Sequence, residues 1–182
     1  MTSPPLRAAT IEVIFDRRAI AVRIEALAAE IANADLENLI VISILKGSFI
    51  FAADLIRSLH EAGLAPEVDF LFLSSYGKGT ASSGTVVVLR DIEIDVAGRS
   101  VLLVDDILES GRTLAFAKQL LREKGAERVA TCVLLDKPGR RAAAIEADFR
   151  GFECPDAFVV GYGMDLAHRY RELPFVGRVA EA

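Results

Sequence analysis

The chain alternates between short, mostly apolar runs and stretches in which apolar residues recur at helical spacing. Mostly apolar runs of this length, bounded by polar or glycine-containing segments, predict β-strands. The predicted strands span residues 11–15, 39–45, 68–73, 85–89, 101–104, 129–135 and 158–160. The runs at 39–45, 101–104 and 129–135 are typical of strands covered on both faces of a parallel sheet.

Three stretches predict helices. The first follows Asp16, which can cap it, the second runs from Ser48 to a stop at Gly63, and the third spans about 113–124 before Gly125. The inward positions predicted for the first two are Ile20, Ile24, Leu27, Ile31, Phe51, Leu55 and Leu59.

Strands that alternate with helices predict an α/β fold with a doubly wound, mostly parallel sheet. We expect one domain over residues 1–182 with its core at about 35–150. The N-terminal segment and about 151–182 contain short strands and are expected to form a small hood over the ligand crevice. Residues 77–84, rich in Gly, Ser and Thr, predict a mobile loop.

Composition restricts the function classes without choosing among them. The 182 residues carry a net charge of −5, so no general attraction to nucleic acid or membranes is expected. Two cysteines are too few for a disulfide framework or a zinc site. The first residues lack a signal-peptide core, and no apolar run is long enough to span a membrane. We therefore expect a cytoplasmic protein.

The most informative segment begins with the strand at 101–104 and continues through Asp105 and Asp106 to a turn containing Ser110 and Gly111. The carboxyl end of a parallel strand faces the ligand crevice of such a sheet. The turn and the following helix start offer backbone N–H groups that suit a phosphate. The adjacent carboxylates suit sugar hydroxyls or Mg²⁺ instead. Together these features indicate a ribose-phosphate site.

This segment closely resembles the 5-phosphoribosyl-1-pyrophosphate (PRPP) motif of type I phosphoribosyltransferases. The motif is an apolar strand, two acids, two apolar residues, a further acid and then Thr/Ser-Gly-x-Thr. The resemblance implies a Rossmann-like core and Mg²⁺ as cofactor. It also implies that the 5′-phosphate and ribose of PRPP bind at Asp105, Asp106, Ser110, Gly111, Arg112 and Thr113.

Two further segments resemble parts of the 6-oxopurine branch of that family. Lys46 and Gly47 lie between a strand and a helix, as in its pyrophosphate loop, where the peptide before the lysine can be cis. By themselves these two residues are equally compatible with an ordinary loop and a solvated lysine. Ser75 and Tyr76 correspond to the Ser-Tyr pair of its flexible catalytic loop, which excludes water during reaction.

The C-terminal half supplies the remaining matches, and the resemblance to hypoxanthine-guanine phosphoribosyltransferases extends from residue 45 to 173. It implies that Lys137 donates to the purine 6-oxo group, that Phe158 stacks on the purine and that the Val159 carbonyl meets the base edge. Asp165 corresponds to a Mg²⁺-binding carboxylate beside the base and pyrophosphate, and Arg171 to an arginine that reaches pyrophosphate.

Two positions depart from the family pattern. Asp105 stands where purine-salvage members usually have Glu, and Glu109 stands where they usually have Asp near purine N7 as a general base or acid. A glutamate retains the carboxylate but adds one methylene. The alternative for Glu109 is a helix-capping role. The metal-binding carboxylates implied by the resemblance are Asp105, Asp106 and Asp165.

The resemblance thus implies transfer of the phosphoribosyl group from PRPP to N9 of hypoxanthine or guanine, in a homodimer or homotetramer. Two alternatives remain open. One is another base specificity on the same scaffold, xanthine or uracil, although Lys137 and Phe158 argue against uracil. The other is an RNA-binding regulator of pyrimidine genes that shares the fold and an Asp-Asp motif. Such a regulator needs a basic face, which the acidic net charge disfavours.

Overall fold

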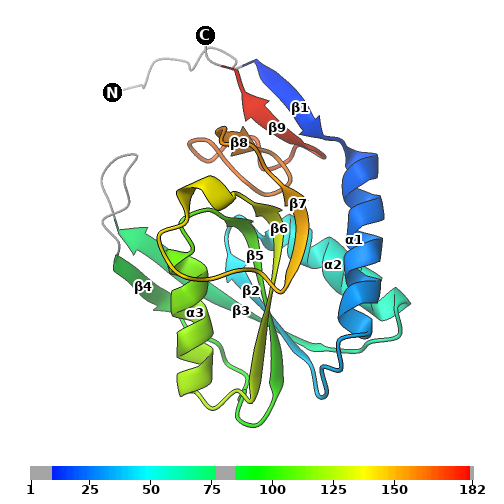
Figure 1. Ribbon diagram of the computed structural model, residues 1–182, viewed down its shortest axis with the longest axis vertical. Helices are drawn as coiled ribbons and strands as arrows, with labels where there is room; N and C mark the ends of the chain where they lie inside the picture. Colours follow the sequence, from blue (N-terminus) through cyan, green and yellow to red (C-terminus); the bar gives the residue numbers. More distant parts are fainter. Residues whose placement is uncertain (1–9, 77–84, 181–182) are drawn as a thin grey trace.

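A computed structural model of the protein describes residues 10–76 and 85–180 (Figure 1). Within these residues the main sheet has the strand order β4-β3-β2-β5-β6-β7, and a smaller sheet has the order β1-β9-β8. The elements in chain order are β1 (Ile11–Phe15), α1 (Arg17–Ala32), β2 (Ile40–Leu45), α2 (Phe49–Glu61), β3 (Glu67–Tyr76), β4 (Thr85–Arg90), β5 (Ser100–Leu108), α3 (Arg112–Glu123), β6 (Arg128–Asp136), the 3₁₀ turn η1 (Pro138–Arg140), β7 (Phe149–Glu153), β8 (Val159–Val160) and β9 (Val176–Val179).

The main sheet is parallel except at one edge. Strand β2 pairs in parallel with β3 and β5, and β6 pairs in parallel with β5 and β7, whereas β4 returns antiparallel to β3. The apolar positions of the central strands β2, β5 and β6 are buried, except for Leu45 and Ile107 near the strand ends, as expected for strands covered on both faces. The predicted mostly parallel α/β sheet is confirmed.

Helices cover both faces of this sheet. In Figure 1, α3 lies on one face, while α1 and α2 lie on the other. All seven predicted inward positions of α1 and α2 are buried. The predicted cap is also present, since the Asp16 side chain accepts a hydrogen bond of 2.8 Å from the Ala19 N–H.

The pattern underestimated two strands and missed two others. Strand β3 continues past its predicted end at residue 73 to Tyr76, because it pairs there with β4. Strand β5 continues to Leu108 instead of ending at residue 104, because its pairing with β6 extends to Asp136. Strand β7 is an edge strand containing Arg150 and Glu153, and β9 contains Gly177 and Arg178, so neither has an uninterrupted apolar run. Partner strands supplied by the rest of the fold determine both.

The small sheet joins the two ends of the described chain and lies beside the main sheet in Figure 1. It contains β1 from the N-terminal segment and β8 and β9 from the C-terminal one. Helix α1 packs in the layer of α2, and β7, which ends at Glu153, stays in the main sheet. We use the name hood below for β1 together with the residues after Glu153.

Candidate active site

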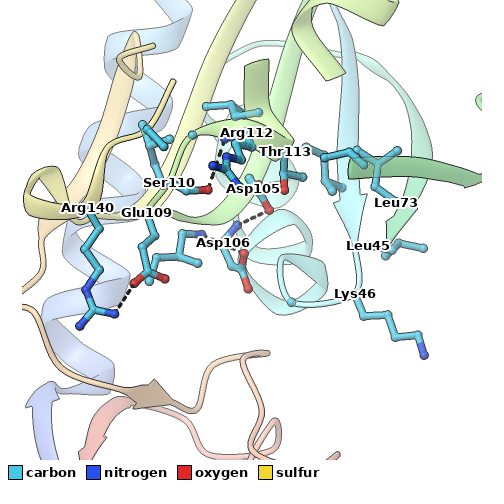
Figure 2. Close-up of a pocket in the computed structure, with 18 residues that line it drawn as sticks. Leu45, Lys46, Leu73, Asp105, Asp106, Glu109, Ser110, Arg112, Thr113 and Arg140 are labelled. Carbon is cyan, nitrogen blue, oxygen red and sulfur yellow. Dashed lines mark hydrogen bonds and ion pairs between the residues drawn. The ribbon is translucent and has the colours of Figure 1, made fainter. Parts of the chain in front are cut away.

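Two adjoining pockets open at the carboxyl ends of β2, β5 and β6. We call them the loop pocket, of about 590 Å³, and the hood pocket, of about 430 Å³. The loop pocket, drawn in Figure 2, contains the segment from Asp105 to Thr113, and the hood pocket contains residues of the C-terminal part. Both pockets are lined by Leu45, Lys46, Gly47, Leu73, Asp106, Ile107 and Glu109.

The turn between β5 and α3 forms one wall of the loop pocket. Ser110, Gly111, Arg112 and Thr113 all line it, so the structure brings the predicted phosphate-binding residues together. Gly111 has φ +78°, and a Cβ there would lie 2.6 Å from Ile145 Cγ2. Only glycine fits this turn without strain. Because α3 begins directly after it, the positive end of the helix dipole faces the pocket.

Asp105 and Asp106 lie on the floor of the loop pocket near the end of β5. Asp105 is only 8% exposed, and its Oδ1 accepts a hydrogen bond of 3.0 Å from the Asp106 N–H. Burial raises the pKa of Asp105 well above its ordinary value, and the neighbouring Asp106 charge raises it further. Burial also raises the pKa of Asp106, which Arg171 partly opposes. A cation or a set of hydroxyl donors would stabilise the ionised pair.

The loop after β2 packs directly against this acid pair. A Cβ on Gly47 would lie 1.7 Å from Asp106 Oδ2, so the absence of a side chain at Gly47 is what lets the two strand ends meet. The Leu45–Lys46 peptide bond is cis. Lys46 lines both pockets, with its Nζ 5.4 Å from the centre of the Phe72 ring.

The hood pocket brings a buried lysine and an exposed aromatic ring to one cavity. Lys137 is 6% exposed, and its Nζ donates a hydrogen bond of 2.7 Å to the Ala157 carbonyl. Phe158 is 57% exposed although it is a large apolar side chain, whereas the next residue, Val159, is buried. All three line the pocket, so the residues predicted to contact a base lie together there.

Asp165 and Arg171 form an ion pair on the same pocket, with 2.7 Å between Oδ1 and Nη2. Arg171 also donates a hydrogen bond of 2.6 Å to the Gly163 carbonyl. Among the described residues, no three acidic, histidine or cysteine side chains are close enough to hold a metal ion by themselves. The three expected metal ligands therefore do not form one cluster of this kind, although Asp106 and Asp165 line the same pocket.

Glu109 lies between the two pockets and lines both. Its Oε1 is 3.5 Å from Arg140 Nη1, and Figure 2 shows the two side chains pointing toward each other. Arg140 also pairs with Asp156, at 2.7 Å. Arg140 belongs to a pocket wall that sequence reasoning missed, because the turn after Lys137 has no periodic pattern that would indicate its direction.

Ser75 and Tyr76 are the last residues of β3, and their side chains lie outside what the structure describes. The loop expected at residues 77–84 lies outside the described residues as well. The backbone of β3 nevertheless leads to the edge of the hood pocket, which Ser74 lines.

A parallel sheet that holds two adjacent acids and a glycine-containing turn before a helix at its carboxyl edge is the arrangement of a phosphoribosyltransferase. The phosphoribosyl transferase domain family matches residues 10–167, and the chain belongs to this family. Among the described residues, moreover, no helix has the length and apolar character needed to cross a membrane.

Curated relatives and solved structures agree with this family. The chain is 41% identical over 173 residues to the hypoxanthine phosphoribosyltransferase of Escherichia coli K12, covering 93% of this chain and 96% of that protein. It is 42% identical over 167 residues to the hypoxanthine-guanine phosphoribosyltransferase of Bacillus subtilis, covering 91% of each. A crystal structure of a Staphylococcus aureus hypoxanthine phosphoribosyltransferase superposes with a TM-score of 0.87 at 37% identity, covering 93% of this chain and 91% of that one.

Proposed function

We propose that this protein transfers the 5-phosphoribosyl group of PRPP to N9 of a 6-oxopurine, hypoxanthine or guanine, and releases pyrophosphate. The observation that carries the proposal is the junction of the two pockets. A phosphate-sized turn and an acid pair lie on one side, a buried lysine and an exposed aromatic ring lie on the other, and Lys46, Gly47, Asp106 and Glu109 line both. The curated relatives of this chain carry the name of that activity.

The loop pocket would hold the phosphoribosyl half of PRPP. Ser110, Gly111, Arg112 and Thr113 would bind the 5′-phosphate through hydroxyl groups, N–H groups and the start of α3. Asp105 and Asp106 would accept hydrogen bonds from the ribose hydroxyls. Ionised, this pair would also stabilise the positive charge that develops at the anomeric carbon as pyrophosphate leaves.

Pyrophosphate would leave beside Lys46 and Gly47, which line both pockets. Lys46, the loop at Gly47 and Arg171 would neutralise it. Mg²⁺ would bind through substrate oxygens and individual carboxylates, Asp105 and Asp106 on one side and Asp165 on the other. This donor set fits Mg²⁺, which is usually held by one or two carboxylates, water and substrate phosphates rather than by an all-protein cage. When bound, the ion offsets the charge on PRPP and its leaving group.

The base would occupy the hood pocket. Its ring would stack on Phe158, which is exposed in this structure, and its edge would meet the Val159 carbonyl. Lys137 has three N–H donors, so it can keep its bond to Ala157 and donate another to the 6-oxo group. Glu109, at the boundary of the two pockets, would exchange a proton or share a hydrogen bond with purine N7.

Three further parts of the proposal concern the surroundings of the site. The segment beginning at Ser75 and Tyr76 would close over the reacting centre and exclude water. The hood would form one wall of the base pocket within a single domain. The protein would act in the cytoplasm as a homodimer or homotetramer, without nucleic acid.

The test is an initial-rate assay of purified protein with PRPP and Mg²⁺. Hypoxanthine, guanine, xanthine, adenine and uracil are compared side by side. Hypoxanthine and guanine should turn over, and adenine should be a very poor substrate because Lys137 offers a donor where adenine also has one. Turnover of xanthine or uracil alone would replace the proposed specificity. Absence of all turnover together with salt-dependent RNA binding would favour the regulator.

A further inference from the structure

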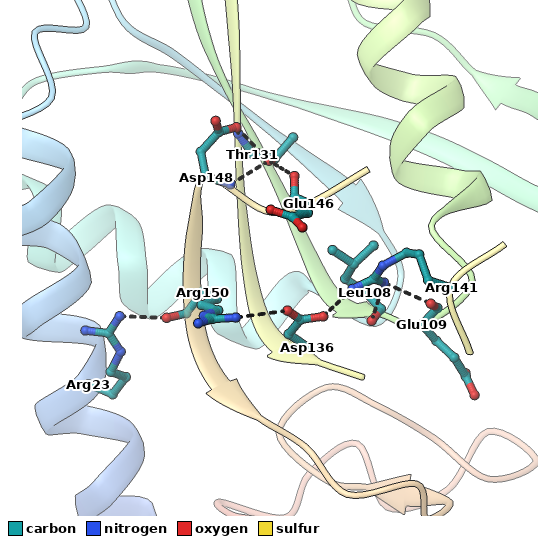
Figure 3. A network of polar contacts seen from close by, with 9 residues as sticks. All are labelled: Arg23, Leu108, Glu109, Thr131, Asp136, Arg141, Glu146, Asp148 and Arg150. Atoms are coloured by element: carbon teal, nitrogen blue, oxygen red, sulfur yellow. Dashed lines mark hydrogen bonds and ion pairs between the residues drawn. The ribbon is translucent and has the colours of Figure 1, made fainter. Parts of the chain in front are cut away.

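Beside the phosphate loop, residues 108–113, lies a polar network centred on an arginine that no step of the proposed reaction uses (Figure 3). At its centre is Arg141, whose Nη1 donates to the Leu108 carbonyl at 3.0 Å and to the Glu109 carbonyl at 2.9 Å. Its Nη2 donates to Asp136 Oδ1, and the Asp136 side chain is only 9% exposed. One guanidinium thus joins two carbonyls of the phosphate loop to a buried carboxylate at the end of β6.

The third carbonyl of the loop is bound from the same side. The Ser110 carbonyl accepts hydrogen bonds from the N–H groups of Ala142, at 2.9 Å, and Ala143, at 3.0 Å. The peptide groups that begin at Leu108, Glu109 and Ser110 therefore all point their carbonyls toward the segment 141–143.

This orientation fixes the direction of the N–H groups as well. A trans peptide is planar, with its N–H pointing opposite to its carbonyl. Carbonyls that point toward segment 141–143 therefore turn the N–H groups of Glu109, Ser110 and Gly111 away from that segment, and all three residues line the loop pocket. Within residues 10–76 and 85–180, no hydrogen-bond acceptor is found for these three N–H groups. They are available to an anion in the pocket.

We propose that Arg141 is a positioning residue that preorganises the phosphate loop for an anion without touching it. Arg141 does not line the loop pocket, but it lines a separate cavity of about 810 Å³ together with Asp136 and Arg150. The inference rests on the proposed function only in naming the anion as the 5′-phosphate of PRPP. An arginine suits this role because its planar fork can serve two carbonyls and a carboxylate together, whereas a lysine presents one point charge.

The central experiment measures KM and kcat of Arg141→Ala. The 5′-phosphate is bound equally in ground state and transition state, so a disordered loop should raise the KM for PRPP by a larger factor than it lowers kcat, which falls only as far as the Glu109 side chain is displaced. The KM for hypoxanthine should stay nearly unchanged. Loss of contacts to a charged group predicts a rise in KM of roughly 10–100-fold. Arg141→Lys should recover only part of the affinity. A fall in kcat with an unchanged KM for PRPP would overturn the proposal.

Arg150→Ala is the matched control. Arg150 approaches the same carboxylate, with 3.6 Å between Nη1 and Asp136 Oδ2, but it is 63% exposed and its side chain binds no carbonyl of the phosphate loop. Its kinetics should resemble those of the unmodified protein. If the KM for PRPP rose equally in both arginine variants, the cause would be loss of positive charge beside Asp136. That result would overturn the role of the contacts between Arg141 and the carbonyls.

Chemical rescue separates positioning from a general loss of structure. The cavity behind the loop gives free guanidinium access to the space vacated in Arg141→Ala. At about 0.05 M, far below denaturing concentrations, guanidinium chloride should lower the KM for PRPP several-fold relative to sodium chloride. Weakening of activity by guanidinium in this variant would show that the residue is merely structural. If Arg141→Ala does not fold, Asp136→Asn takes its place, because it removes the carboxylate that orients the guanidinium. It should likewise raise the KM for PRPP and leave the KM for hypoxanthine nearly unchanged.

A binding measurement keeps this inference distinct from the proposed function. Failure of the unmodified protein to turn over hypoxanthine with PRPP would contradict the proposed function alone. Ribose 5-phosphate binding, followed by calorimetry, should still be weaker in Arg141→Ala than in Arg150→Ala. Equal affinities would overturn the positioning role whatever the enzyme's substrate is.

Discussion

At the residue scale, the site depends on charged groups that the fold places in unfavourable surroundings. Asp105 is buried, the adjacent Asp106 is half-buried, and desolvation raises the pKa of each. Lys137 is almost fully buried beside them in the adjoining pocket. Such groups weaken the unliganded protein and become favourable when a polar substrate binds, which is typical of a functional site.

Asp105 makes stability depend on pH. The folded protein holds this carboxyl proton more tightly than the unfolded chain, whose Asp titrates near 3.8. Stability contributed at low pH is therefore lost as pH rises above about 4 and through the raised pKa. We expect Asp105→Asn to be more stable than the unmodified protein at pH 7 and nearly equal to it at pH 4, because the neutral amide avoids the cost of a buried charge. Urea unfolding at both pH values tests this, and equal stability at pH 7 would show that the acid is not destabilising.

Lys137 should decide which base is accepted. A hydrogen bond from a charged donor contributes about 1.5–3 kcal/mol, so Lys137→Ala should lower kcat/KM for hypoxanthine roughly 10–100-fold. Selection against adenine should weaken at the same time. Lys124→Ala is the control, because Lys124 pairs with Asp91 and lines neither pocket. Unchanged base selection in Lys137→Ala would remove the main support for a 6-oxopurine substrate.

At the element scale, the site is built from loops that follow parallel strands. The carboxyl ends of β2, β5 and β6 lie at one edge of the sheet, so three loops distant in sequence converge there. Close approach of the β2 loop to β5 requires a residue without a side chain, which explains Gly47. The same principle explains Gly111 in the turn before α3.

Gly47→Ala tests the contact between these strand ends. Its Cβ would lie 1.7 Å from Asp106 Oδ2, so either the acid or the loop must move. We expect kcat/KM for PRPP to fall at least about tenfold, because misplacement by 1 Å can cost far more than the lost contact itself. Gly139→Ala, where a Cβ would meet no atom within 4 Å, is the matched control and should keep normal activity. Equal activity of the two variants would show that the β2 loop tolerates a side chain.

At the scale of the whole molecule, the two pockets combine the core with the hood. The core provides the phosphate loop and acid pair, and the hood provides Phe158, Asp165 and Arg171. A substrate that spans both pockets should therefore stabilise the entire fold. It should do so only when its negative charge is neutralised, because Asp106 and Asp165 lie on the same walls.

PRPP and Mg²⁺ together should raise the melting temperature of the protein. At a PRPP concentration of about 100 times its Kd, binding adds about 2.7 kcal/mol, which raises the Tm of a domain of this size by roughly 5–10 °C. Excess chelator should abolish both this rise and turnover, and Mn²⁺ should restore them. Scanning calorimetry and the rate assay are the measurements. Undiminished turnover in excess chelator would reject the metal requirement.

The sequence by itself determined the central architecture. Mostly apolar runs identified β2 and β6. Apolar residues at helical spacing identified the buried faces of α1 and α2, because a helix that packs on a sheet needs apolar residues along one face. The motif from Asp105 to Thr113 could also be recognised in the sequence, since phosphate, hydroxyl and metal binding each need particular residue types. These requirements are met by residues that are contiguous in the chain, so the sequence alone shows them.

Only the tertiary structure decided what no local pattern records. Because β5 pairs with β6, it extends beyond Asp105 and Asp106 to Leu108. Strands β7 and β9 have mixed polar and apolar sequences and form because partner strands lie beside them. The placement of Asp165 on the same pocket as Asp106 and the hydrogen bonds from Arg141 to the phosphate loop likewise depend on segments distant in sequence. Contacts of this kind arise from the packing of whole elements, so the residues that form them carry no periodic signal of their own.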